Sequence, residues 1–157
     1  GQDVTGVSHA ASTGAVGRAV TGPAVPILSV RPKLTFNGIT NRGWTRVSDL
    51  DLITSNEVFW EIVRNGTLTG ATWTSLGPNS VTEQDVSATA VVGGEVIAAG
   101  YAAGGSRGGL SQTELTLEQF ILTLDPMGTS PDILTVRVSK LSTNATVYAA
   151  LTVEEEF

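Results

Sequence analysis

The chain has 157 residues, the size of a single domain with a substantial hydrophobic core. Hydrophobic residues make up 41% of it and charged residues only 15%, which is typical of a subunit whose surface is covered by neighbours. The absence of cysteine excludes disulfides, thiolate metal sites and cysteine nucleophiles. No apolar run approaches the roughly 20 residues of a membrane-spanning helix, and no segment has the pattern of a secretory signal, so no membrane association is predicted.

Charge is divided unevenly along the chain. Residues 1–47 carry five basic groups and one acidic group, a net charge of +4, whereas residues 48–157 carry four basic and fourteen acidic groups, a net charge of −10. A basic segment attached to an acidic body favours contact with acidic protein surfaces, including those of a neighbouring copy. Nucleic acid is the weaker alternative, because the five charges are dispersed and lack an aromatic platform.

Residues 1–28 are predicted to form an extended N-terminal arm ahead of a β-sandwich domain over residues 29–157. Glycines at 6, 14, 17 and 22 and prolines at 23 and 26 oppose any regular helix there. Alone, such a segment cannot offset its ordering entropy, so it is expected to be disordered or to lie extended along another surface. Removing residues 1–26 should therefore leave the body folded.

The rest of the chain alternates short apolar segments with turn signals, which predicts eight or nine strands and no long helix. Strands are expected at 27–36, 44–54, 57–64, 71–76, 84–92, 95–103, 133–141 and 144–153. Residues 115–124 fit either a strand or a short helix. The spacing is typical of an all-β fold, an antiparallel β-sandwich or jelly roll.

Proline and glycine give the finer predictions within this pattern. Pro32 removes a ladder donor, so the first strand is expected to be an edge strand or to carry a bulge. Asn37-Gly38 predicts a tight turn, and Asp125–Gly128 another. Gly93-Gly94 predicts a hairpin between the flanking strands, and the strands at 133–141 and 144–153 are expected to form a terminal hairpin.

Few residues have the pattern of a chemical site. His9 is the only histidine and lies in the predicted arm, where no positioned partner is expected, so a structural role is predicted. Asp49 and Asp51 share a strand face, and with Glu57 or Glu61 they would suit Ca²⁺ or the acid pair of a glycosidase, although a solvated strand face is the preferred interpretation. The glycine-rich loop at 104–109 lacks the ending of a phosphate loop and is interpreted as a surface loop.

Aromatic and terminal residues suggest where contacts form. Phe59 and Trp60 are adjacent on a strand, so they should point to opposite faces, and one of them must leave the central core. The acidic tail Glu154–Glu156 is expected to be a solvated end, with contact to a basic arm from a neighbouring copy as the sharper alternative.

The run Val30–Gly43, VRPKLTFNGITNRG, resembles a segment of virion structural proteins of tailed bacteriophages. So do Asn65–Trp73, Gly93-Gly94, Asp132–Val136 and an ending with Leu151 shortly before Glu154, and the resemblance covers roughly residues 29–156. It implies a location in the phage particle, assembled in the host cytoplasm, with the major capsid protein or other virion proteins as partners. It implies no catalytic residue, metal or cofactor.

The resemblance suggests a capsid cement or decoration protein, with trimers preferred by analogy to sites on local threefold axes. The candidate assembly interface consists of the basic residues and one tryptophan of the N-terminal third: Arg18, Arg31, Lys33, Arg42, Trp44 and Arg46. The alternative is a tail- or head-fibre domain that binds a host surface glycan through Trp44, Trp60, Tyr101 and the 104–109 loop. A hydrolase using Asp49 and Asp51 is the third and weakest hypothesis.

Overall fold

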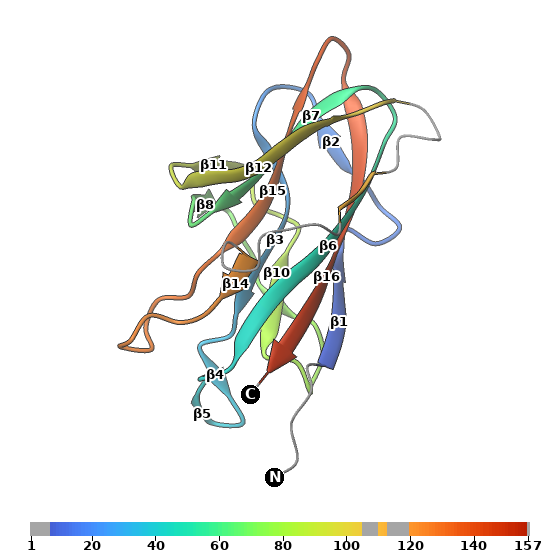
Figure 1. Ribbon diagram of the computed structural model, residues 1–157. Helices are drawn as coiled ribbons and strands as arrows, with labels where there is room; N and C mark the ends of the chain where they lie inside the picture. The colour runs from blue at the N-terminus through green and yellow to red at the C-terminus, as the bar shows by residue number, and fades with distance from the viewer. Residues whose placement is uncertain (1–6, 105–109, 113–119, 157) are drawn as a thin grey trace.

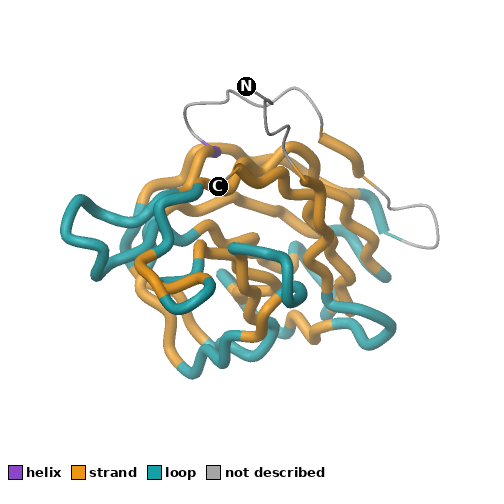
Figure 2. Tube along the Cα trace, turned by 90° about the horizontal axis from the view of Figure 1, so that it is seen from below, coloured by secondary structure: helices purple, strands orange, loops and turns teal. Residues whose placement is uncertain are grey.

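The computed structural model describes residues 7–104, 110–112 and 120–156, and every element with described bounds is a strand. Two antiparallel sheets pack face to face, so the predicted all-β sandwich is confirmed (Figures 1 and 2). The first, the β16 sheet, contains β1 (Val7–Ser12), β2 (Arg18–Val20), β6 (Trp44–Thr54), β13 (Leu110–Gln112), β14 (Ile121–Leu122) and β16 (Ala145–Glu156).

The second sheet, the β15 sheet, has the order β12-β7-β15-β3-β10-β9. Its strands are β3 (Val25–Pro32), β7 (Val58–Arg64), β9 (Thr74–Ser75), β10 (Thr82–Asp85), β12 (Glu95–Ala102) and β15 (Leu134–Lys140). Two small sheets complete the fold: β4 (Thr35–Phe36) pairs with β5 (Ile39–Thr40), and β8 (Thr67–Thr69) pairs with β11 (Ala90–Val92).

The core forms where the inward faces of the two sheets meet. In β16, buried residues alternate with more exposed ones along the whole strand, because successive side chains of a strand point to opposite faces. Leu50, Leu52 and Leu151 from the β16 sheet are fully buried in one cluster with Ile62 and Leu134 from the β15 sheet.

The predicted N-terminal arm is not separate from the body. β1 pairs with β16 over six residues, from Val7 opposite Glu155 to Ser12 opposite Ala150, and β2 pairs with the beginning of β16. The predicted boundary at residue 28 falls inside β3. The described part of the N-terminal segment is extended, which was one of the two expected alternatives. The surface that it lies along belongs to its own domain.

The prediction that the first strand lies at an edge is wrong. β3 lies between β15 and β10, and its ladder tolerates Pro32 because that residue is the last of the strand. The bulge alternative is confirmed, although it lies elsewhere: the β3–β15 register skips Ile27, next to Pro26.

The Asn-Gly and Gly-Gly pairs correctly predicted where turns occur, but not always which strands pair across them. Asn37 and Gly38 have positive φ values of 54° and 82° and join β4 to β5 in the expected tight hairpin. Gly93 and Gly94 also have positive φ, yet β11 pairs with β8 and β12 with β7, so the predicted hairpin is wrong. The predicted terminal hairpin is wrong as well, because β15 and β16 belong to different sheets.

The other predicted strands agree with the structure to different degrees. The single strand predicted at 84–92 is wrong, because β10 ends at Asp85 and β11 begins at Ala90 in another sheet. The strand at 44–54 is β6, that at 57–64 is β7, and that at 71–76 shortens to β9. Of the ambiguous stretch at 115–124, residues 115–119 lie outside the described part of the chain, and so does most of the 104–109 loop.

Truncation tests the placement of the N-terminal segment. Removing residues 1–26 deletes β1, β2 and the first two residues of β3, so we expect loss of the cooperative thermal unfolding transition followed by circular dichroism. Removing residues 1–6 leaves every described strand in place and should preserve the transition. A cooperative transition in the longer truncation would show that residues 7–26 are dispensable, as an arm would be.

Candidate functional site

One end of the sandwich brings together several loops, the start of β1 and the end of β16. Val7 lies opposite Glu155, and Glu156 lies opposite Trp44, so β1 begins and β16 ends beside the start of β6. The β4–β5 hairpin is at this end too, near the start of β1 and the end of β16 (Figure 1). The loop at 125–131 is adjacent, because a Cβ added to Gly128 would lie 2.8 Å from the Thr40 side chain. We call this region the hairpin end.

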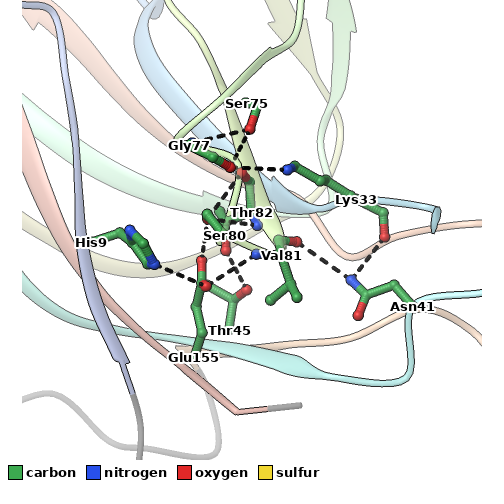
Figure 3. A network of polar contacts seen from close by, with 10 residues as sticks. All are labelled: His9, Lys33, Asn41, Thr45, Ser75, Gly77, Ser80, Val81, Thr82 and Glu155. Carbon is green, nitrogen blue, oxygen red and sulfur yellow. Dashed lines mark hydrogen bonds and ion pairs between the residues drawn. The ribbon is translucent and has the colours of Figure 1, made fainter. Parts of the chain in front are cut away.

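A buried carboxylate lies at the base of the hairpin end. Glu155 is fully buried; its Oε2 accepts a hydrogen bond of 2.6 Å from Ser80 Oγ, and its Oε1 accepts one of 3.0 Å from the Val81 backbone N–H (Figure 3). His9 Nε2 is 3.4 Å from Oε1. The inward alternation of β16 aims the side chain at the β15 sheet, so Glu155 connects the two layers.

A second set of contacts continues from Val81 to the hairpin. Lys33 N–H donates to the Val81 carbonyl at 2.8 Å, and the buried Asn41 Nδ2 donates to the Lys33 carbonyl at 2.9 Å. Asn41 Oδ1 accepts from Gly43 N–H at 2.9 Å, and Asn41 N–H donates to the Leu34 carbonyl. These bonds fix both ends of the segment that carries β4 and β5.

The arrangement around Glu155 does not form a nucleophile and base. Ser80 Oγ and His9 Nε2 both approach the same carboxylate, and among the described residues no hydrogen bond joins Ser80 to His9. Nucleophilic catalysis requires the hydroxyl to donate to the base. The contacts are instead those that hold a buried charge in place.

Apolar side chains are exposed on the outside of this end. Met127 is 79% exposed, Ile39 70% and Leu34 41%. A hollow beside them is lined by Phe36, Asn37, Ile39, Thr40, Asn41, Arg42 and Gly43. Exposed apolar residues on several adjacent loops are typical of a surface that contacts another molecule.

The loop that carries Met127 is held by Asp125. The Asp125 carboxylate accepts hydrogen bonds from the backbone N–H groups of Ser130 and Thr129 and from the Thr129 hydroxyl. These donors, the Ser130 N–H foremost, lower the pKa of Asp125 below its ordinary value of 3.8. Gly128 N–H closes the predicted turn onto the Asp125 carbonyl at 2.9 Å.

Most residues of the predicted assembly interface are engaged within the chain. Arg18 donates to the carbonyls of Val86 and Ala88, at the far end of the β16 sheet from the hairpin. Arg31 pairs with Glu83 at 2.7 Å and lies over the Trp73 ring.

The remaining four predicted residues lie at the hairpin end. Arg46 pairs with Glu154 and approaches the half-buried Trp44 ring, while Lys33 Nζ donates to the Gly77 carbonyl at 3.4 Å. Arg42 is exposed, without an ion-pair partner among the described residues. A contact between any of these residues and a partner stays a prediction.

The alternatives drawn from other residues gain less from the structure. Phe59 and Trp60 do point to opposite faces. Trp60 is buried in the core and is not available to a glycan, whereas Phe59 packs against the exposed Tyr101 with ring centroids 5.1 Å apart. Asp49 and Asp51 lie on β6, but Glu61 pairs with Arg137 on the other sheet. Among the described residues no group of three or more acidic or histidine side chains is placed to hold a metal ion.

The sequence did not single out Glu155, and it led us to expect no partner for His9. The structure corrects both points, because His9 lies beside the buried Glu155 carboxylate. The tail is not a solvated end, because β16 runs to Glu156. The missed signal was the alternation of Val147, Ala149, Leu151 and Val153, which places Glu155 on the same buried face. Within the chain Glu154 pairs with Arg46 of β6, and the alternative contact with the basic arm of a neighbouring copy stays a prediction.

No family model, curated protein or solved structure matches the chain. The described residues contain no helix long and apolar enough to cross a membrane. The resemblance to phage virion proteins therefore stays a prediction, and the functional argument depends on the geometry of the hairpin end.

Replacing Glu155 by alanine should lower the free energy of unfolding by about 2 to 4 kcal/mol, because the Ser80 hydroxyl and the Val81 N–H lose their charged acceptor. Glu154→Ala is the matched control: its ion pair with Arg46 is part-exposed, so the loss should stay below about 1 kcal/mol. Urea denaturation measures both. Equal losses would contradict the role given to Glu155.

Asp125→Ala should lower the thermal midpoint at pH 7, because the Ser130 and Thr129 donors lose the carboxylate. The pKa of Asp125 is lower in the folded chain than in the unfolded chain, so its contribution is present above the unfolded pKa and is lost as pH falls through the folded one. The difference in midpoint between wild type and variant should therefore shrink below pH 3.8. A constant difference from pH 7 to strongly acidic pH would show that the carboxylate charge is not responsible.

Proposed function

We propose that the chain is a structural subunit of a tailed-bacteriophage particle, a capsid cement or decoration protein that attaches through its hairpin end. The observation that carries the proposal is the exposed apolar surface of Leu34, Ile39 and Met127. Asn41 holds the segment that carries Leu34 and Ile39, and Asp125 holds the loop that carries Met127. The sequence resemblance over residues 29–156 supports a location in a phage particle. The exposed apolar surface supports attachment through the hairpin end.

Physical chemistry favours attachment to a large partner. Apolar side chains on fixed loops lose little conformational freedom on binding, so more of their burial contributes to affinity. Each exposed side chain that becomes buried contributes about 1.5 to 3 kcal/mol, and a particle presents many equivalent sites. The exposed Arg42 adds a preference for an acidic surface on the major capsid protein or another virion protein.

Fixed loops also suit a mechanical role. A cement protein must transmit force between the subunits that it joins, and mobile loops would yield first. Here the hairpin is tied to β3 and to the loop before β10 through Asn41 and Lys33, and that loop is tied to β16 through Glu155. Force on the hairpin is therefore shared between both sheets.

Capsid binding tests the proposal directly. Purified protein added to capsids that lack it should co-sediment with them in a fixed ratio and raise their resistance to heat. The double variant Ile39→Asp/Met127→Asp should bind at least tenfold more weakly, because two charges would be desolvated at the contact. Val92→Asp, at a residue 64% exposed on β11, is the matched control and should bind normally.

Other outcomes would refute the proposal. If the protein does not bind capsids but binds the host envelope, the fibre hypothesis replaces it. If the double variant binds as tightly as wild type, attachment does not use the hairpin end.

A further inference from the structure

The free edge of the β15 sheet is formed by β12, which among the described strands pairs only with β7. Its eight residues, Glu95–Ala102, read EVIAAGYA. Edge strands carry unpaired backbone N–H and C=O groups that can hydrogen-bond to a strand of another chain. Proline, lysine or a very short strand usually prevents such pairing. β9, at the opposite edge, is two residues long. β12 contains neither proline nor lysine, and its one bulge lies near its beginning, between Val96 and Ala98.

The regular part of this edge is apolar and uncharged. From Ala98 to Ala102 each residue has one partner on β7 in unbroken register. Ala99 and Tyr101 face outward, and Tyr101 is 70% exposed. Ala98, Gly100 and Ala102 face inward, where Gly100 packs so closely on Trp60 that an added Cβ would lie 2.7 Å from the indole ring.

The neighbouring surface is equally free of net charge. Next to Ala99 on the outer face lies Glu61, which pairs with Arg137 at 2.9 Å. Next to Tyr101 lies Phe59, and the two ring centroids are 5.1 Å apart with the ring planes tilted by 44°. The chain as a whole carries a net charge of −6, but the regular part of this edge, from Ala98 to Ala102, presents no charge that would repel an identical edge.

We infer that β12 pairs with β12 of a second copy, antiparallel and about a two-fold axis at Gly100. In that register Ala99 of each copy lies opposite Tyr101 of the other, so a small side chain faces a large one twice. The Glu95 residues of the two copies lie at opposite ends of the paired strands, so the two like charges do not meet. The backbone groups of both edges gain partners, and the two β15 sheets become one continuous sheet.

The occupant is a second copy because the strand is complementary to itself. With a two-fold axis at Gly100, each small Ala99 faces a large Tyr101 and the two Glu95 carboxylates stay apart. The pairing requires no residue outside the strand. The inference does not depend on the proposed function: it predicts a dimer in solution, in place of the trimer suggested by the family resemblance.

Sedimentation equilibrium over a range of concentrations tests the pairing. The wild type should approach twice the mass of its chain, and Ala99→Lys should weaken dimerisation at least tenfold, because lysine at an edge strand opposes pairing. Ala99 is exposed, so the variant monomer should stay folded, with a cooperative thermal transition whose midpoint, unlike that of the wild type, does not depend on protein concentration. Ile53→Lys, at a residue 45% exposed on the outer face of β6, is the control and should remain dimeric.

Cysteine cross-linking tests the register, because the chain contains no cysteine of its own. A mixture of Ala99→Cys and Tyr101→Cys proteins should form a disulfide-linked pair under mild oxidation, since the two positions face each other across the axis. Neither protein alone should cross-link at a comparable rate.

Four results would overturn the inference. These are a monomer at every concentration, a trimer, a dimer that Ala99→Lys leaves intact, and a monomer that pairs through β12 with another protein. Cross-linking of either cysteine variant alone, without the mixed product, would overturn the register.

Discussion

The hairpin end depends on burying the charge of Glu155. A carboxylate removed from water costs several kcal/mol unless donors surround it, and here the Ser80 hydroxyl and the Val81 N–H supply them. Those donors fix the loop before β10, and the Val81 carbonyl then receives Lys33 N–H from the chain that leads to β4. One desolvated charge at the end of the C-terminal strand thus sets the position of loops that are distant in sequence. The part of the proposed assembly surface that carries Leu34 and Ile39 depends on these contacts, whereas Asp125 holds the loop of Met127.

Local sequence patterns predicted which residues form strands, but not how the strands pair. Alternation located β6 and β7 nearly to the residue, and Asn37-Gly38 marked its hairpin. Pairing is decided by which strand can bury its inward face, and that is not a local property: β16 takes β1, β2 and β6 as partners and leaves β15 to the other sheet. The N-terminal segment has too few large side chains to look like a strand, yet an edge of β16 was available to it. Of the residues at the hairpin end, the sequence singled out Lys33, Arg42, Trp44 and Arg46. It missed Glu155, because three consecutive glutamates resemble a solvated tail.

The molecule therefore presents two separate surfaces. The hairpin end displays apolar side chains on segments that are held by hydrogen bonds. The β12 edge displays unpaired backbone groups with small and aromatic residues. Pairing at β12 would join two chains into a dimer that carries two hairpin ends. Two linked contacts with a particle bind far more tightly than either contact alone. The low content of charge, which first suggested an assembly protein, matches the character of both surfaces.

Native-state hydrogen exchange at the Val81 amide tests most directly whether Glu155 organises the hairpin end. In the wild type this amide should exchange as slowly as amides of the central strand β15, because it is buried and donates to the carboxylate. In Glu155→Ala, Val81 and the Asn41 amide should exchange through local opening, while β15 amides still exchange only with global unfolding. Fast exchange of Val81 in the wild type, or unchanged protection in the variant, would contradict the account.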